Sequence, residues 1–441
     1  MKNIGEFTKS HLSFNFEKQI DRSMRLSLMD AFFYSLMVGA GETFLPAYAI
    51  SLGSGQITAG ILTSLPLVTG AFLQLFTPKL VQKLGNPKWW VVSSVLVQAC
   101  AFLPLVFFSS LNKPDIVFLF LIFTLYWASG FSVNPFWTYW MSQLIPEAEK
   151  NKYFSVRAKI SQVGLIIGLV AGGLALNYKV EFLPFSSVFG GLFFVAFLCR
   201  LLSGVVLSRK TYKAEWSGVL KEQNFSLKET LNFIRKSSKE RSFLFSLFPF
   251  YASVFISAPF VNPFMLAQLK MEYSHYMGAL VALLIGKFFC SWYLEQRSQK
   301  ITPYGVFFWG VLLISPGPLM WGVSNGLIYI MMLQFFSGMA WACFEVGIQL
   351  ILFKKVSLRE KIPFVSMYNF FMSLAAIIGT FIGAQSLRWL TLSYDSYINL
   401  FLFGGVVRFL TAFPLLRMIY HLGRSSAKEA EAELTSQTTA A

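Results

Sequence analysis

"EKNKYFSVRAKISQVGLIIGLVAGG", residues 149–173, has a counterpart later in the chain in "EKIPFVSMYNFFMSLAAIIGTFIGA", residues 360–384. Each stretch begins with a charged pair and continues into an apolar run with two glycines four residues apart. Aligned from their first residues, the stretches share identities that include Glu149 with Glu360, Lys150 with Lys361, Ser155 with Ser366, Ile167 with Ile378, Gly168 with Gly379 and Gly172 with Gly383. A charged loop and a glycine pair in the same register indicate an internal repeat.

The composition around these stretches is that of a membrane protein. Of the 441 residues, 55% are hydrophobic and 13% are charged, whereas soluble domains carry roughly 25% charged residues. Apolar runs of about 20 residues are long enough to cross a hydrocarbon core of roughly 30 Å. Twelve such runs are present: 26–50, 56–77, 89–110, 115–144, 159–177, 184–208, 242–267, 273–296, 303–323, 326–353, 365–386 and 397–420. The sequence predicts an all-α polytopic membrane protein with twelve transmembrane helices.

A polar stretch, residues 209–241, divides these runs six and six. Because six spans return the chain to its starting side, the two halves are expected to be parallel repeats, that is, two pseudo-symmetric six-helix bundles. Within the linker, "LKETLNFIRKSSKE" is compatible with an interfacial helix or with a solvated connection. The expected domains are a cytoplasmic segment (1–25), a first bundle (26–208), the cytoplasmic linker (209–241), a second bundle (242–420) and a disordered cytoplasmic tail (421–441).

The formal charge of +16 is distributed as the positive-inside rule requires. With the N-terminus inside, 30 of the 37 Lys and Arg residues fall on cytoplasmic segments, and four fall on outside loops: Lys113, Lys179, Lys270 and Arg388. This bias predicts that both termini are cytoplasmic. A nucleic-acid-binding protein would instead gather its basic residues on one exposed face, so we expect no nucleic-acid partner.

The sequence contains no motif for catalysis, metal binding or a cofactor. The four cysteines fall one each in four different spans, and the three histidines lie at the end of a span or in terminal segments, without metal-ligand spacing. A phosphate-binding glycine loop is missing, which argues against direct use of ATP. We therefore expect no enzyme activity, metal or cofactor, and no disulfide framework.

Two loops resemble those of the major facilitator superfamily. "PKLVQKLGNPKWW", residues 78–90, resembles the family signature between the second and third helices, with Lys83, Gly85 and Lys88 at or near matching positions. "IPEAEKNKYFSVRAK", residues 145–159, resembles the connection between the fourth and fifth helices. The signature is incomplete, because Pro78 replaces its glycine and Gln82 its aspartate. The resemblance implies the fold of that superfamily and solute transport by alternating access, with the first helix of each half lining the central cavity.

Glu42, within "GAGETFLPAY" (residues 39–48), is a carboxylate in the otherwise apolar first run. It either lines the cavity, where it would bind a proton or a cationic group, or forms a fixed interhelical bond. Burial disfavours a charged carboxylate and so makes protonation accessible. Pro46 removes the N–H that would bond the carbonyl of Glu42, so a bend is expected here. Glu42 is the first candidate for proton coupling.

The second half holds its own intramembrane charges, which usually face a cavity or a partner. Glu345 lies in the tenth run with Gln349 one turn later on the same face, and both are candidates for the cavity. Lys287 is the obvious partner of Glu345 in a buried pair. Arg408 lies deep in the twelfth run and is a second candidate for buried charge pairing.

Charges nearer the cytoplasmic side suggest a gate. Asp30 and Arg157 are expected to approach the cytoplasmic surface, where they either form a salt bridge when the inside is closed or remain solvated. Arg200 lies about two turns from the cytoplasmic end of its span and is expected to extend its side chain to that surface.

Two Asn-Pro pairs occur deep in spans, at Asn134 and at Asn262. Each asparagine either caps the backbone that proline opens or contacts the solute. Trp137 belongs to an unusually aromatic fourth span, where it either stacks on a solute or packs among helices.

Together these features predict a secondary transporter that moves a small solute across a bacterial inner membrane as a monomer, with proton coupling as its expected energy source. The alternatives are a lipid or lipophilic-compound translocase of the same fold, an uncoupled uniporter, and a transport-inactive membrane sensor or assembly protein.

Overall fold

The computed structural model describes residues 18–52, 56–84, 86–109, 116–180, 187–213, 235, 238–354, 356–390 and 392–439. Within these ranges the regular secondary structure is helical, with no strand. The proposed linker helix, residues 227–240, lies almost wholly outside the described residues.

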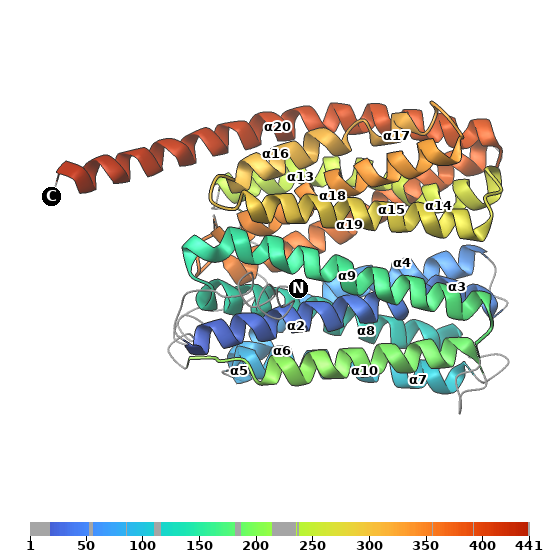
Figure 1. Ribbon diagram of the computed structural model, residues 1–441, viewed down its shortest axis with the longest axis horizontal. Coiled ribbons are helices and arrows are strands. Elements are labelled where there is room, and N and C mark those ends of the chain that lie inside the picture. The colour runs from blue at the N-terminus through green and yellow to red at the C-terminus, as the bar shows by residue number, and fades with distance from the viewer. Residues whose placement is uncertain are drawn as a thin grey trace, which may run out of the picture. The chain divides into compact units, whose positions relative to one another are not determined.

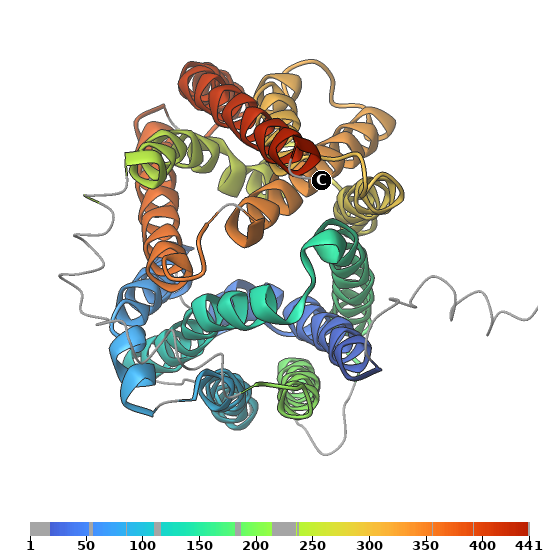
Figure 2. The same cartoon turned by 90° about the vertical axis from the view of Figure 1, so that its left-hand side faces the viewer.

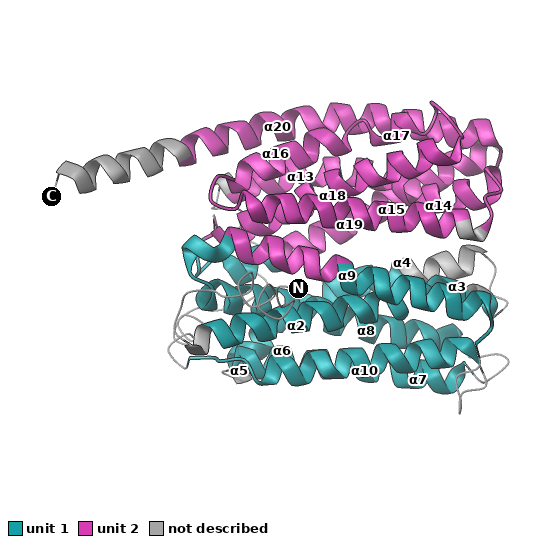
Figure 3. Ribbon diagram, viewed as in Figure 1, with its two compact units in different colours: residues 1–150, 163–229, 357–366 teal, residues 151–162, 230–356, 367–441 magenta. Residues whose placement is uncertain are grey.

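The chain divides into two compact units (Figure 3). Unit 1 comprises residues 1–150, 163–229 and 357–366, and unit 2 comprises residues 151–162, 230–356 and 367–441. The units differ from the predicted bundles because each includes a short segment, 357–366 or 151–162, from the other bundle. Both segments belong to or border the matching stretches of sequence.

The helices of the first half run along the long axis of the view in Figure 1 and are seen end-on in Figure 2. In chain order they are α2 (Lys18–Ala40), the 3₁₀ turn η1 (Glu42–Phe44), α3 (Leu45–Ser51), α4 (Gln56–Gln74), α5 (Thr77–Leu84), α6 (Pro87–Cys100), α7 (Phe102–Phe108), α8 (Ile116–Leu144), the 3₁₀ turn η2 (Glu147–Glu149), α9 (Lys150–Asn177) and α10 (Val188–Ser208).

The second half has the corresponding order of elements. They are α13 (Ser238–Ser257), the 3₁₀ turn η4 (Ala258–Phe260), α14 (Val261–Pro263), the π-helical turn η5 (Phe264–Gln268), α15 (Tyr273–Gln296), α16 (Pro303–Ile314), α17 (Gly317–Met320), α18 (Leu327–Lys354), α19 (Lys361–Leu390) and α20 (Tyr394–Thr439).

Ten continuous helical segments of the described chain are long and apolar enough to cross a membrane. They coincide with the third to twelfth predicted runs. The first two runs are occupied by α2, η1 and α3, and by α4, which fall outside these ten. The all-α membrane fold is as predicted, and the elements are consistent with twelve spans.

Two helix starts show how local sequence repeats in both halves. Asn86 precedes Pro87 at the start of α6, and its Oδ1 accepts a hydrogen bond from the Lys88 N–H at 3.1 Å. Thr302 precedes Pro303 at the start of α16, and its Oγ1 accepts from the Gly305 N–H at 3.1 Å. Polar caps satisfy N–H groups that lack helical partners, and proline fits the first helical position.

The first helix of each half is interrupted at a corresponding place. In unit 1, α2 ends at Ala40 and the turn η1 follows; in unit 2, α13 ends at Ser257 and the turn η4 follows. Since Pro46 lacks an N–H, the Glu42 carbonyl accepts instead from the Leu45 N–H, three residues on. The helix is therefore interrupted by a 3₁₀ turn next to Pro46.

The matching glycines pack against these interrupted helices. A Cβ added at Gly168 would lie 2.6 Å from the Leu36 carbonyl oxygen, and one at Gly172 would lie 2.4 Å from the Phe44 ring. The same contacts recur in unit 2, where Gly379 faces the Ala252 carbonyl oxygen and Gly383 faces Ile256 and Phe260. Small residues let membrane helices approach closely, so the glycine pair brings the fifth span of each half against its first.

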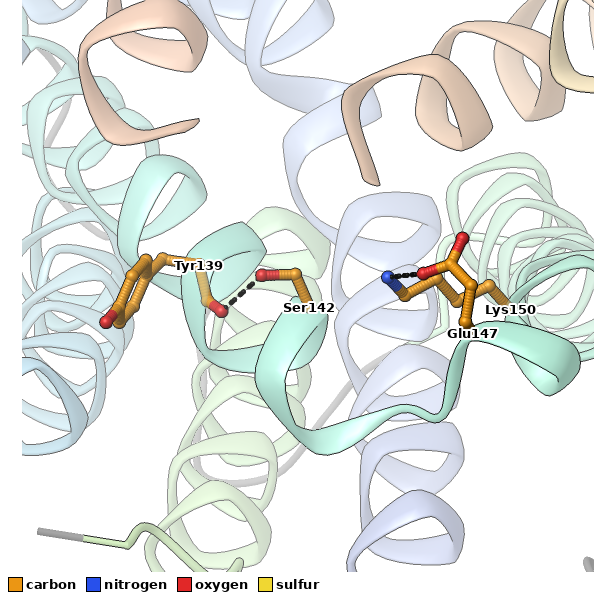
Figure 4. A network of polar contacts seen from close by, with 4 residues as sticks. All are labelled: Tyr139, Ser142, Glu147 and Lys150. Carbon is orange, nitrogen blue, oxygen red and sulfur yellow. Dashed lines mark hydrogen bonds and ion pairs between the residues drawn. The ribbon is translucent and has the colours of Figure 1, made fainter. Parts of the chain in front are cut away.

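The connection from α8 to α9 is short and fastened by local bonds (Figure 4). Ser142 Oγ donates to the Tyr139 carbonyl oxygen at 2.7 Å, and Lys150 Nζ pairs with Glu147 Oε2 at 2.5 Å. Both bonds join residues three apart in the chain. This turn carries the "IPEAEK" loop noted in the sequence.

Helix α20 continues to Thr439, far beyond the end of the twelfth predicted run (Figure 1). The structure thus contains a helix where the sequence suggested a disordered tail from residue 421. The physical reason lies in "AKEAEAEL", residues 427–434, which is composed of strong helix formers and contains neither glycine nor proline. Low complexity alone was a poor guide to this segment.

All four cysteines are free thiols. Cys290 of α15 and Cys343 of α18 lie with their sulfur atoms 3.3 Å apart, Cys199 is buried, and Cys100 is exposed.

Candidate functional site

Arg200 is the centre of a buried polar cluster in unit 1. It projects from α10 and is only 4% exposed. Its Nε donates to Gln98 Oε1 of α6 at 2.8 Å and its Nη1 donates to Ser203 Oγ at 3.1 Å. The guanidinium carbon lies 4.7 Å from the centre of the Tyr34 ring, within cation–π range. The expectation that this side chain extends to the cytoplasmic surface is wrong. Its hydrogen-bond partners lie inside the bundle and hold it there.

Asp30 of α2 supplies a carboxylate to this cluster. It is 3% exposed, and its Oδ1 accepts a hydrogen bond from Ser203 Oγ at 2.7 Å. Ser203 therefore connects Asp30 to Arg200, since its hydroxyl accepts from the arginine and donates to the carboxylate. Opposite charges linked in this way compensate one another's loss of hydration.

Glu42 joins the same cluster from the turn η1. The Tyr126 hydroxyl of α8 donates to Glu42 Oε2, and Glu42 and Asp30 both interact electrostatically with Arg200. The Phe102 ring packs edge-on against Tyr126 at 5.2 Å. We call this set the Arg200 cluster: Asp30, Tyr34, Glu42, Gln98, Tyr126, Arg200 and Ser203. It places two carboxylates around one guanidinium, with one carboxylate at a helix break.

The predicted gate between Asp30 and Arg157 joins residues of different units and stays a prediction. What the structure describes is Asp30 turned into the Arg200 cluster.

In unit 2 the structure brings Lys287 and Glu345 together. Lys287 Nζ of α15 lies 2.5 Å from Glu345 Oε1 of α18, with side chains 15% and 43% exposed. Gln349, one turn further along α18, is exposed. The ion pair joins two helices that pack tightly, because Gly286 and Gly338 each face the backbone of the opposite helix.

Removing one member of this pair is expected to destabilise the protein. Lys287→Met or Glu345→Gln should each lower the free energy of unfolding by about 1–3 kcal/mol, below the cost for a fully buried pair because Glu345 is partly exposed. The double variant should recover part of this loss, as thermal denaturation of the purified protein in detergent would measure. Lys270→Met, at an exposed position of the same unit, is the matched control. Additive losses in the double variant would contradict the pairing.

Arg408 of α20 lines the second polar feature of unit 2. This is a cavity of about 250 Å³ whose polar lining residues include Ser257, Asn262, Gln334, Ser337 and Arg408. Two of the predicted residues, Asn262 and Arg408, thus meet at one cavity. Arg408 is 5% exposed and donates to Ile314 O at 3.2 Å, to Val254 O at 3.1 Å and to Ser257 Oγ at 2.9 Å.

Two predicted residues of the fourth span contact side chains outside the Arg200 cluster. Asn134 Oδ1 accepts from Thr138 Oγ1 at 3.4 Å within α8. The Trp137 ring is 5.9 Å from Lys210 Nζ, which lies 4.6 Å from the Trp140 ring and 3.1 Å from Ser27 Oγ. These contacts belong to the end of unit 1 that carries the start of α2.

Sequence reasoning missed several members of both sites. Gln98, Ser203, Ser257 and Gln334 are uncharged polar residues inside apolar runs, where they barely change the hydropathy. Ser203 could have been found from its spacing, since residues three apart share a helix face. Among the described residues, no cluster of His, Cys, Asp and Glu could hold a metal ion.

The comparisons with known proteins agree with this architecture. A sequence model described as Major Facilitator Superfamily matches residues 28–379. No curated protein sequence matches the chain. Similar solved structures include the human organic anion transporter MFSD10 (TETRAN), at 12% identity with a TM-score of 0.67, covering 90% of this chain and 100% of that one.

Two further structures have the same fold. A bacterial homologue of the iron transporter ferroportin has 12% identity and a TM-score of 0.69, covering 90% of this chain and 98% of that one. A variant of the E. coli fucose:proton symporter FucP has 12% identity and a TM-score of 0.60, covering 89% and 98%. At these identities the likeness establishes the fold.

Proposed function

Because the chain belongs to the major facilitator superfamily, we propose that it is a secondary active transporter that couples movement of a small solute to movement of protons. Glu42 is the proton-binding carboxylate in this proposal. The chain is an integral membrane protein with the fold of membrane transporters. The strong bias of basic residues supports cytoplasmic termini, and we propose the bacterial inner membrane as its location.

The observation that carries the proposal is the position of Glu42. It lies at the 3₁₀ turn between α2 and α3, it accepts a hydrogen bond from Tyr126, and it interacts with the buried Arg200. A carboxylate with a purely structural role would fit equally well in an uninterrupted helix. A carboxylate at a break can change its bonds when the helix segments on either side of it move.

The chemistry of a coupled step follows from the cluster. With Glu42 ionised, the cluster holds two carboxylates and one guanidinium, and the Tyr126 hydroxyl donates to Glu42. A proton taken up by Glu42 converts it into a neutral group that can donate a hydrogen bond itself. Asp30 then remains as the carboxylate linked to Arg200 through Ser203. Protonation thus weakens the attraction that holds the turn η1 against the cluster, and the bend can change with the proton.

The test uses the purified chain in liposomes that enclose a pH-sensitive dye. Sugars, amino acids, organic anions and organic cations are added one at a time, and solute-dependent proton movement is recorded. We expect wild-type protein to move protons with one solute class. Glu42→Gln, which resembles the protonated side chain, should keep exchange of that labelled solute across the membrane without a gradient, while its proton movement falls to that of empty liposomes.

The control is Glu272→Gln, which removes a carboxylate whose side chain is 79% exposed and should behave as wild type. Proton movement that persists in Glu42→Gln would refute its assignment. Solute flux that ignores the pH gradient in the wild type would identify an uncoupled uniporter. Movement of labelled lipid, with none of these solutes, would identify a lipid translocase.

A further inference from the structure

We propose that the cavity beside Arg408 in unit 2 binds a small organic anion, with the anionic group against Arg408 and the apolar body against Trp321 and Trp341. The claim that this anion is the transported solute rests on the proposed function. The binding site itself rests only on the cavity and its lining.

Arg408 is a buried cation without a compensating anion. Its three hydrogen bonds go to two backbone carbonyls and one hydroxyl, and its Nε has no hydrogen-bond partner. Within the described residues it forms no ion pair. A guanidinium has five donors, so two remain beyond the three bonds. Neutral acceptors offset only part of the hydration that a buried charge loses. A bound anion would therefore stabilise the guanidinium of Arg408.

Arg200 in unit 1 has a corresponding position, and there carboxylates accompany the guanidinium. Helix α10, which carries Arg200, packs on α2 and α6; helix α20, which carries Arg408, packs on α13 and α16. Each arginine therefore belongs to the sixth span of its half and bonds to elements of the first or third. Arg200 has Asp30 and Glu42 nearby. Glu42 lies two residues beyond the end of α2, and the residue two beyond the end of α13 in unit 2 is Pro259. A bound anion would supply the missing carboxylate.

The cavity has the size and surface for such a ligand. Its volume of about 250 Å³ lies just below the range of roughly 300–1,000 Å³ that is common for drug-sized ligands. None of its described lining residues is acidic, and Arg408 is its only charged one. Asn262, Gln334 and Ser337 offer neutral hydrogen bonds, while Trp321, Trp341 and Phe401 supply aromatic surface. This combination fits an anion with an apolar or aromatic body.

A purely structural role for Arg408 makes a different prediction. In that case the arginine only ties α20 to α13 and α16 through the carbonyls, and the cavity has no preference for charge. The two roles are distinguished by comparing the binding affinity of an anion with that of a neutral molecule of the same shape.

The experiment measures binding of benzoate, benzamide and inorganic phosphate to the purified full-length protein by calorimetry, without a membrane or a pH gradient. Benzoate should bind, and benzamide should bind at least about tenfold more weakly, since a charge-assisted hydrogen bond contributes about 1.5–3 kcal/mol. Arg408→Gln should weaken benzoate binding by about tenfold to a hundredfold on the same basis. Asn262→Ala, an uncharged change in the cavity, should weaken benzoate and benzamide alike.

Arg388→Gln removes a charge from an exposed position of the same unit and should leave benzoate binding unchanged. Equal binding of benzoate and benzamide, equal benzoate binding by wild type and Arg408→Gln, or no binding of any probe would overturn the proposal. Phosphate binding as tight as benzoate binding would overturn the assignment of an organic anion. Because no gradient is present, these outcomes are independent of proton coupling, which Glu42→Gln tests separately.

Discussion

Replacing Gly379 with alanine is expected to lower the free energy of unfolding by about 3 kcal/mol or more, although the change adds one methyl group. Alanine in a helix interior is ordinarily about 1 kcal/mol better than glycine, so the expected sign is opposite to the intrinsic preference. The reason is a clash, because the added Cβ would lie 2.1 Å from the Ala252 carbonyl oxygen and 2.9 Å from Phe255 Cβ. The backbone of α13 would have to move away from α19.

The matched control is Gly322→Ala, where the new Cβ would meet its nearest atoms at 3.6 and 3.8 Å, in ordinary contact. This variant should stay within about 0.5 kcal/mol of wild type. Fluorescence-detected size-exclusion chromatography and thermal denaturation in detergent give the folded fraction and the midpoint for both. Equal midpoints for the two alanine variants would show that α13 and α19 do not approach as closely as described.

Replacing Arg200 with methionine is expected to destabilise the protein by about 3–5 kcal/mol, the range for removing one partner from a buried charge cluster. The change leaves Asp30 and Glu42 in the bundle without their cation, and Gln98 without its donor. Asp30→Asn in the same chain should restore part of the loss, since it removes one of the two carboxylate charges that interact with Arg200. Urea or thermal unfolding of the purified protein measures both effects.

Arg25→Met serves as the comparison for this prediction. Arg25 pairs with Asp21 at 2.5 Å, but its side chain is 51% exposed, and exposed pairs contribute little. If Arg25→Met lowered the free energy of unfolding as much as Arg200→Met, burial of the charge would not be the cause of the effect at Arg200. If Asp30→Asn further destabilised Arg200→Met, the carboxylate would have a partner other than the arginine.

The helical framework could be predicted because it depends on run length and on proline, both visible in one dimension. The apolar run of the tenth span, 326–353, matches α18 within a residue at each end. Pro46 predicted the interruption near Glu42, since a missing N–H has a local consequence whatever surrounds it. The partnership of Lys287 with Glu345 followed from the scarcity of opposite charges within the second half's spans.

The course of Arg200 could not be predicted in the same way. Its depth in the span allowed the side chain to reach the surface. Whether it instead stays inside depends on whether its face of α10 packs against Gln98 of α6. Gln98 comes from a different span, and uncharged polar residues barely change the hydropathy of a run. The cavity at Arg408 was equally hidden, because its polar lining residues Ser257 and Gln334 lie on different helices, α13 and α18, far apart in the sequence.

The distribution of thiols makes motion at the interrupted first helix accessible to spectroscopy. Cys100 is the exposed thiol, while Cys199 and Cys290 are buried and Cys343 is partly covered. With Cys100 replaced by serine, nitroxide labels can be placed at the exposed Thr43 in η1 and at Tyr178, just after α9. Pulsed dipolar distances between these labels would then follow the bend directly, on either side of a pH change, against a background of shielded sulfur atoms.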